Sequence, residues 1–200
     1  MSLKIAGGIH KGLRLETPSG NITRPTSEIL RAAVFNICQH KIQEANFLDL
    51  YAGSGAIGIE ALSRGASHCT FVEKDRNALQ ALKKNIEKTA SENSTTVFPC
   101  DVQVALKKFH CMFDIVYIDP PYGEKHIEQL SEKVVESLLI TLDLKNLLNK
   151  DAWVFLEFSS YSKKDFSKLP FEHLKWDNTR TFARSVLYLF KYINPQDPLN

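Results

Sequence analysis

Four residues in the middle of the chain, Asp119-Pro120-Pro121-Tyr122, combine a carboxylate, two prolines and an aromatic ring. Proline fixes φ near about −65° and has no backbone donor, so the carbonyls and the Asp119 carboxylate would form a rigid edge of hydrogen-bond acceptors. The Tyr122 ring would add a flat stacking surface. An exocyclic amine on a planar base needs such acceptors and such a surface. An ordinary strand exit with an Asx-type turn explains the four residues equally well when they are taken alone.

A glycine loop precedes this stretch. Residues 53–58, Gly-Ser-Gly-Ala-Ile-Gly, fit the pattern G-x-G-x-x-G and lie between a predicted strand and a predicted helix, which is the context that gives this short pattern its meaning. We expect Gly53 and Gly55 to let a ligand approach the backbone, and Gly58 to let the helix and the strand pack closely. Glu73 ends the next predicted strand, where its carboxylate could accept from both hydroxyls of a ribose. A dinucleotide and S-adenosylmethionine both fit these features.

Asp49 favours S-adenosylmethionine. It lies four residues before Gly53, and a carboxylate there would repel a pyrophosphate but attract a sulfonium and an ammonium group. Asp101, just after the third predicted strand, could accept from an adenine amino group, although capping its own short helix is the stronger interpretation of that residue alone. Together with Glu73 and Asp119, four acids stand at the carboxyl ends of four consecutive strands. In an open α/β sheet the ligand crevice lies at that edge.

Alternating strands and helices would position these acids. Short apolar runs predict strands at 47–51, 69–73, 95–99, 113–118 and 152–158. Helical spacing predicts helices at 57–63, 75–90 and 101–108, and another that contains Ile127, Leu130, Val134 and Leu138. The runs 174–182 and 185–192 predict an antiparallel hairpin. The order predicts a mostly parallel, seven-stranded α/β sheet with helices on both faces and an antiparallel C-terminal hairpin.

The N-terminal segment carries the positive charge. Residues 1–31 contain five basic and two acidic residues, a net charge of +3, whereas the 20 basic and 21 acidic residues that follow give −1. We expect a small β-hairpin over 4–15, with Ile5, Ile9, Leu13 and Leu15 inward, and an amphipathic helix over 27–39. The excess charge indicates a polyanionic partner, although a solvated basic surface would look the same. The side chains that we expect to contact such a partner are Lys11, Arg14, Arg24 and Arg31.

Composition excludes several classes of protein. A chain of 200 residues can bury a full core without disulfides or metals. It has no run of eighteen apolar residues and no signal-peptide pattern at its start, so we expect neither a membrane span nor export, and a cytoplasmic location. The four cysteines, Cys38, Cys69, Cys100 and Cys111, lack metal-ligand spacing, and we expect reduced core thiols and no metal.

The motifs together resemble a known family. The segment 48–55 with Asp119-Pro120-Pro121-Tyr122 looks like the amino-group methyltransferases of the Rossmann-like class I fold, and most of the chain is similar to the RsmD family, bacterial enzymes that methylate the N2 amine of a guanine in 16S rRNA. The further matching runs are residues 4–8, 12–14, 24–26, 34–36, 60–66 and 71–75. The C-terminal hairpin departs from the family, because Phe182-Ala183 stands where a Tyr-Gly pair is usual.

The resemblance implies S-adenosylmethionine as the cofactor and 16S rRNA as the partner, naked or as a ribonucleoprotein assembly intermediate. Asp49 and Glu73 would then hold the methionine and ribose parts and Asp101 the adenine, beside the glycine loop. Asp119 and the Pro120 carbonyl would accept from the target amine while Tyr122 stacks on the base. We expect a monomer with an RNA-contacting extension at 1–44, a methyltransferase domain at 45–193 and a tail at 194–200.

Other functions remain open from the residues. An adenine N6 or cytosine N4 amine, on RNA or DNA, would meet the same acceptors at Asp119 and Pro120. A non-catalytic RNA-binding protein could keep the fold without the activity. A nicotinamide-dependent oxidoreductase could use the same glycine loop.

Overall fold

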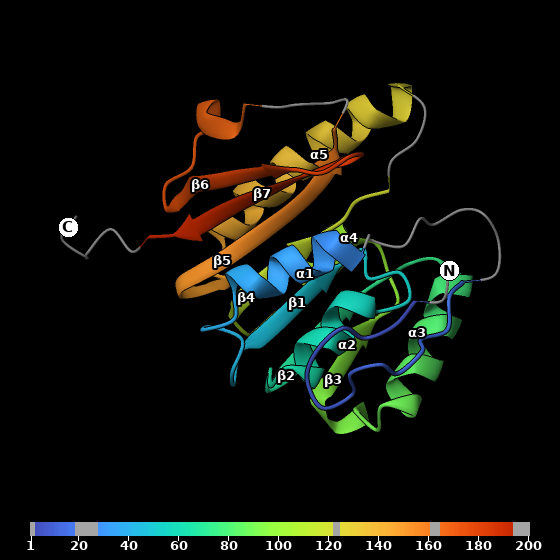
Figure 1. Cartoon of the computed structure of the whole chain (residues 1–200). Helices are drawn as coiled ribbons and strands as arrows, with labels where there is room; N and C mark the ends of the chain where they lie inside the picture. The colour runs from blue at the N-terminus through green and yellow to red at the C-terminus, as the bar shows by residue number, and fades with distance from the viewer. Residues whose placement is uncertain (1–2, 19–27, 122–124, 161–164, 194–200) are drawn as a thin grey trace. The chain divides into compact units, whose positions relative to one another are not determined.

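The computed structural model describes residues 3–18, 28–121, 125–160 and 165–193 (Figure 1). The fold is mixed α/β with a seven-stranded, mostly parallel sheet whose C-terminal strands are antiparallel, as the sequence predicted. The chain divides into two compact units, residues 1–105 and 106–200. The predicted extension at 1–44 lies within the first unit, and the boundary between the two units falls after residue 105.

The first unit holds three parallel strands in the order β3-β2-β1. The elements, in chain order, are α1 (Glu28–Ile37), β1 (Asn46–Leu50), α2 (Ala56–Ser63), β2 (His68–Val72), α3 (Arg76–Lys88), β3 (Thr95–Phe98) and α4 (Val102–Ala105), with a short 3-10 turn at Glu92–Ser94 before β3. Strands β1 and β2 are buried over four of their five residues, as near-continuous apolar runs in a parallel sheet require. Helix α2 packs on both of them. The predicted ranges differ from these bounds by a few residues at most.

Residues 3–18 are hairpin-like and form one isolated bridge, between Lys4 and Arg14. Ile5 and Leu15 are buried as predicted, whereas the prediction for Ile9 is wrong because this side chain is 84% exposed. The reason lies in the turn at residues 7–12. The backbone N–H of Ile9 donates to the Ser63 carbonyl (2.8 Å), and Gly8 has a positive φ of 79°, so the turn fixes its backbone on the end of α2 and directs Ile9 outward.

The second unit joins its strands in the order β4-β5-β7-β6. Its elements are β4 (Phe113–Ile118), α5 (Lys125–Leu144), β5 (Leu148–Ser159), a 3-10 turn (Phe166–Lys168), β6 (Leu174–Thr181) and β7 (Ser185–Tyr192). Strand β5 is parallel to β4 and antiparallel to β7, and β6 and β7 form the predicted hairpin, visible in red in Figure 1. Helix α5 buries Val135, Leu138, Leu139 and Leu142.

No helix in the described part of the chain is long and apolar enough to cross a membrane. All four cysteines are free thiols. Cys38 and Cys69 are core residues as predicted, and burial raises the pKa of Cys38 to about 12, which keeps it protonated and unreactive. Cys111 is exposed, so the prediction of a core thiol is wrong for this residue.

Candidate active site

The glycine turn after β1 runs through left-handed backbone at three positions: Tyr51 (φ 63°), Gly53 (φ 57°) and Gly55 (φ 80°). Tyr51 bears the cost of this conformation, since a residue with a Cβ avoids it, and such residues cluster at functional sites. The backbone N–H of Ala52 donates to the Val72 carbonyl (3.0 Å), which ties the turn to the end of β2. A Cβ added to Gly53 would meet nothing within 4 Å. Open space therefore lies beside Gly53, where the sequence predicted that a ligand approaches the backbone.

Gly55 and Gly58 are glycines for a different reason. A Cβ on Gly55 would lie 2.3 Å from the Leu82 side chain, so the missing side chain of Gly55 makes room for α3. The expected approach of a ligand to the backbone of Gly55 stays a prediction. A Cβ on Gly58 would lie 2.3 Å from the Phe71 ring, which confirms its predicted role in close packing of α2 on β2.

Glu73 holds the turn through its carboxylate. The backbone N–H of Gly53 donates to Oε2 (2.8 Å), and the N–H groups of Lys74 and Asp75 donate to Oε1 (2.7 and 2.8 Å). Glu73 and Gly53, predicted separately, are thus in direct contact. Because each carboxylate oxygen has two lone pairs, Oε2 keeps an acceptor site for a ligand hydroxyl.

Asp49 lies beneath the same turn and is only 2% exposed. The backbone N–H of Gly58, in the first turn of α2, donates to Oδ2 (3.0 Å). Burial raises the pKa of Asp49 to about 7; the Gly58 hydrogen bond partly opposes this rise, and the nearby charge of Glu73 adds to it. A buried carboxylate with such a pKa gains most from a cationic ligand, which would stabilise its ionised form.

Asp101 follows β3 and begins α4. The backbone N–H of Gln103 donates to Oδ1 (3.0 Å), so Asp101 does cap its helix, and Lys74 Nζ donates to Oδ2 (3.0 Å). Burial alone would raise the pKa of Asp101, but the Lys74 hydrogen bond, the Gln103 N–H and the Lys74 charge together lower it. Burial and the nearby charge of Asp101 raise the pKa of the Tyr51 hydroxyl to about 12. Lys74 and Tyr51 were not predicted site residues, although Tyr51 directly follows β1 and Lys74 stands two residues after the end of β2.

Asn85 in α3 is a further residue that sequence reasoning missed. It is fully buried, and its Nδ2 donates to the carbonyls of Ser54 and Glu16 (both 2.9 Å), while its Oδ1 accepts from the Glu16 backbone N–H (2.7 Å). One side chain therefore joins the glycine turn, α3 and the N-terminal segment. A buried asparagine in an amphipathic helix is the signal that could have indicated it.

The acceptor motif stands at the end of β4 in the second unit. Strand β4 is buried over five of its six residues and ends at Ile118, as predicted. Asp119 is partly exposed, Pro120 is buried and Pro121 is exposed, so the motif begins where the strand leaves the core. Tyr122 lies outside the described residues.

A buried network stands beside the end of β4. The Tyr117 hydroxyl donates to Oε2 of Glu157 (2.6 Å), and the Ser185 hydroxyl donates to Oε1 (2.7 Å). Glu157 is 5% exposed, and the three residues come from β4, β5 and β7. The sequence did not indicate this network, because its members are far apart in the chain and none belongs to a motif.

The side chains predicted to contact RNA divide into three groups. Lys11 and Arg14 are exposed, as that function requires, and Arg24 lies outside the described residues. Arg31 was expected to contact the polyanionic partner, which requires an exposed side chain, and this is wrong. It is 2% exposed, donates to the Lys4 carbonyl (2.8 Å) and lies 3.7 Å from the buried carboxylate of Glu60. Arg31 fastens the N-terminal segment and α1 to α2.

Comparison with known proteins extends the resemblance over the chain. The family described as conserved hypothetical protein 95 matches residues 3–191. The Bacillus subtilis protein "Putative rRNA methyltransferase YlbH" is 33% identical over 78% of this chain and 82% of its own length. Ribosomal RNA small subunit methyltransferase D of Buchnera aphidicola is 33% identical over 74% of this chain and 79% of its own. The solved structure titled "Putative methyltransferase yhhF from Escherichia coli" superimposes with a TM-score of 0.81 at 26% identity, covering 96% of this chain and 99% of that one.

Proposed function

Because this chain belongs to the conserved hypothetical protein 95 family, the family of the RsmD methyltransferases, we propose that it methylates the exocyclic N2 amine of a guanine in 16S rRNA with S-adenosylmethionine. The curated relatives are named as methyltransferases of ribosomal RNA. The choice of a guanine and of its N2 amine as the target is our proposal.

The observation that carries the choice of cofactor is the pair of carboxylates around the glycine turn. Asp49 lies buried below the turn, Glu73 binds its backbone, and open space remains at Gly53. A pyrophosphate would have to approach both acids, whereas the ammonium and sulfonium of S-adenosylmethionine gain from them. The residues present therefore fit this cofactor, with Asp49 toward its methionine part, Glu73 toward its ribose and Asp101, already bonded to Lys74, toward its adenine.

Bound S-adenosylmethionine would supply an electrophilic methyl group. The N2 amine of guanine is a poor nucleophile because its lone pair is conjugated with the ring. In this proposal the Asp119 carboxylate and the Pro120 carbonyl accept its two N–H bonds, which orients the amine and favours its pyramidal form as the new N–C bond develops. The nitrogen then loses one proton, for which Asp119 is the nearest assigned acceptor. Most of the rate gain comes from positioning and electrostatics.

The RNA must present its target base unstacked, because an amine within a paired stem is not accessible to Asp119. Tyr122 is assigned to stack on that base. Lys11, Arg14 and Arg24 are assigned to the RNA backbone, and we remove Arg31 from this set because its guanidinium is buried.

Transfer of a labelled methyl group tests the proposal. The full chain is incubated with methyl-labelled S-adenosylmethionine and 16S rRNA, offered naked, as a ribonucleoprotein assembly intermediate and as the assembled small subunit. Nuclease digestion and mass spectrometry then identify the product, which we expect to be N2-methylguanosine. Label on adenine N6 or cytosine N4 would reject the guanine assignment. Binding of RNA without transfer to any of the three substrates would favour the non-catalytic alternative.

A thermal titration separates the cofactors. A ligand present at 100 times its Kd adds about 2.7 kcal/mol to the free energy of unfolding. We expect S-adenosylmethionine to raise the melting temperature and NAD or NADP to leave it unchanged, and the reverse result would indicate an oxidoreductase.

A further inference from the structure

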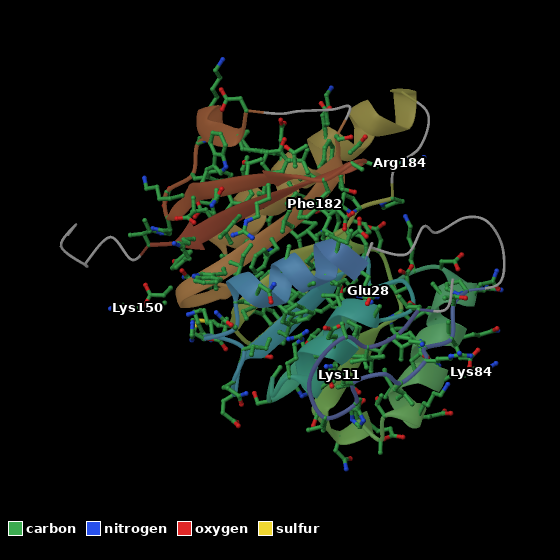
Figure 2. All side chains as sticks on the ribbon, viewed as in Figure 1. Lys11, Glu28, Lys84, Lys150, Phe182 and Arg184 are labelled. Atoms are coloured by element: carbon green, nitrogen blue, oxygen red, sulfur yellow. The ribbon has the colours of Figure 1, made fainter. Side chains whose placement is uncertain are left out.

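We propose that the tip of the β6–β7 hairpin is a second RNA-binding surface, in which Phe182 stacks on a base next to the target and Arg180 and Arg184 contact phosphates. This inference rests on the proposed function, since it names how the same substrate would be held at the acceptor side. Arg184 lies in the turn of the hairpin (Figure 2), between Phe182 and the first residue of β7.

The tip stands at the same edge of the second unit as the acceptor motif. Ile118, the last residue of β4, pairs with Leu156 of β5, and three residues further along β5 Ser159 pairs with Ser185. At about 3.3 Å per residue this separation along the strands is roughly 10 Å. The acceptor motif and the tip are thus close enough for neighbouring nucleotides of one RNA segment.

The tip is held rigidly at this edge. The backbone N–H of Phe182 donates to the Ser185 carbonyl (2.7 Å), which closes the hairpin with a tight turn, and the Ser160 N–H donates to the Arg184 carbonyl (3.2 Å). The Ser185 hydroxyl is also bonded to Glu157, whose other oxygen is bonded to Tyr117, two residues before Asp119. A buried carboxylate thereby connects the hairpin tip to the strand that carries the acceptor motif, and less order is lost when RNA binds such a preformed surface.

Two of the three side chains also share a face of the sheet with this network. Arg180 is opposite Leu187, and Leu187 is opposite Glu157. Phe182 is opposite Ser185, because their backbones are bonded. Directly opposed residues of antiparallel strands point to the same face, so Arg180 and Phe182 lie on the face of Ser185 and Glu157.

Among the described residues, the charges at the tip have no ion-pair partner. Arg180 and Arg184 are exposed, and neither forms an ion pair with any carboxylate among residues 3–18, 28–121, 132–160 and 165–193. At the opposite end of the hairpin Lys191 is neutralised by Asp177 (2.8 Å). Two unpaired arginines around a partly exposed phenyl ring form the pattern that binds unstacked RNA, in which cations contact phosphates and a ring stacks on a base.

Two variants test the two kinds of contact. The double variant Arg180→Gln/Arg184→Gln should weaken RNA binding and lower the slope of log affinity against log salt by about two. Phe182→Ala should weaken RNA binding by about 5- to 100-fold without changing the salt slope, because stacking is not ionic. Phe182→Tyr keeps the ring and should restore binding.

A matched double variant, Lys168→Gln/Lys175→Gln, serves as the control. It removes the same charge from two exposed positions away from the tip, Lys168 in the 3-10 turn before β6 and Lys175 at the start of β6, and the salt slope should stay at the wild-type value. A slope that falls equally in both double variants would overturn the proposal, since RNA would then sense only net charge. Wild-type affinity in the arginine variant and in Phe182→Ala would overturn it as well.

The outcomes separate this inference from the proposed function. Absence of methyl transfer by the wild-type chain would reject the function itself. Transfer by the wild type together with unchanged KM for RNA in the tip variants would reject only the hairpin surface. We expect a raised KM for RNA, an unchanged Kd for S-adenosylmethionine and a melting temperature close to that of wild type.

Discussion

The carboxyl ends of the strands that carry the acids are built differently in the two units. In the first unit, the carboxylates are held mostly by backbone N–H groups: three bind Glu73, one binds Asp49 and one binds Asp101, which the Lys74 ammonium also binds. In the second unit, side-chain hydroxyls bind the buried carboxylate of Glu157, and Asp119 stands partly exposed after its strand.

Under the proposed function, this difference would separate cofactor binding at the first unit from contact with the methyl acceptor at the second. Contacts made by backbone groups depend on the path of the chain, so they suit a cofactor that is the same in all related enzymes. Contacts made by side chains can be altered by single substitutions, so they suit a methyl acceptor that differs between enzymes. Substitutions at the first edge should therefore affect the cofactor, and substitutions at the second should affect methyl transfer and RNA.

The largest effect is expected for Asp119→Ala. Loss of an acceptor used in the transition state should lower single-turnover methyl transfer at least about a hundredfold while the cofactor Kd stays nearly unchanged. The control is Asp151→Asn, an exposed acid of the same unit whose left-handed backbone asparagine tolerates (φ 59°). An unchanged single-turnover rate in the Asp119 variant would remove Asp119 from the mechanism, and a large change in cofactor Kd would contradict the separation of cofactor binding from acceptor contact.

Asp49→Asn should act on the cofactor instead. Removal of the buried negative charge should weaken S-adenosylmethionine binding at least about tenfold, as expected for a lost charge-assisted interaction. In the wild type, cofactor affinity should rise as pH increases through about 7, where Asp49 ionises. Calorimetric titrations from pH 6 to pH 8 measure both effects, and a pH-independent affinity in the wild type would contradict the assignment.

The same residue makes a prediction for stability. The pKa of Asp49 is raised in the folded state, so its contribution to stability is complete below its unfolded pKa of about 4 and is lost as pH rises through about 7. Asparagine does not titrate. Without cofactor, the melting temperature of Asp49→Asn relative to wild type should therefore be higher at pH 8 than at pH 5.

Two glycine variants distinguish a glycine that borders the proposed cofactor site from a glycine that is needed for close packing. Gly53→Ala places a Cβ in open space at φ 57°, and it should cost about 1 kcal/mol of stability but lower cofactor affinity. Gly58→Ala forces a Cβ against Phe71, and it should cost about 1 to 3 kcal/mol while the cofactor affinity of the folded protein is kept. Urea unfolding and cofactor titration of both variants measure the contrast. Equal losses of affinity would mean that the turn does not contact the cofactor.

The smallest effect is expected in the N-terminal segment. Lys11→Gln/Arg14→Gln should lower the salt slope of RNA binding by about two, with little change in melting temperature. Arg31→Gln should show the opposite result, a lower melting temperature and an unchanged slope, because Arg31 is buried against Glu60 and Lys4. A salt slope that responds to Arg31 alone would reverse our assignment of these residues.

Strands were predicted accurately from the sequence where a short apolar run has a glycine or proline near one of its ends. Apolar runs gave β1, β2 and β4 to within one residue, with a glycine after β1, a glycine before β2 and prolines after β4. Their order along the chain gave the parallel sheet. The acids at the strand ends followed from the same reasoning, because the end of a strand in sequence is also its end in space.

Residues whose role depends on distant partners were not predictable. The charge and helical position of Arg31 fit a surface residue, and only the carboxylate of Glu60, 29 positions later, explains its burial. Ile9 fits the alternation of a hairpin, yet its backbone is fixed by Ser63. Gly55 also makes room for Leu82 of α3, which its place in the glycine motif does not indicate. In each case the local pattern does not show the long-range contact.

Asn85 connects the glycine turn to the N-terminal segment, so it could couple the binding of two ligands. Its amide bonds Ser54 in the glycine turn and both backbone groups of Glu16, two residues after Arg14. If RNA contacts the N-terminal segment and the cofactor contacts the glycine turn, as proposed, we expect RNA binding to change the affinity for the cofactor. Thermodynamic reciprocity then requires the cofactor to change the affinity for RNA by the same factor. Asn85→Ala should then remove this coupling, so that each ligand binds with the same affinity whether or not the other is present.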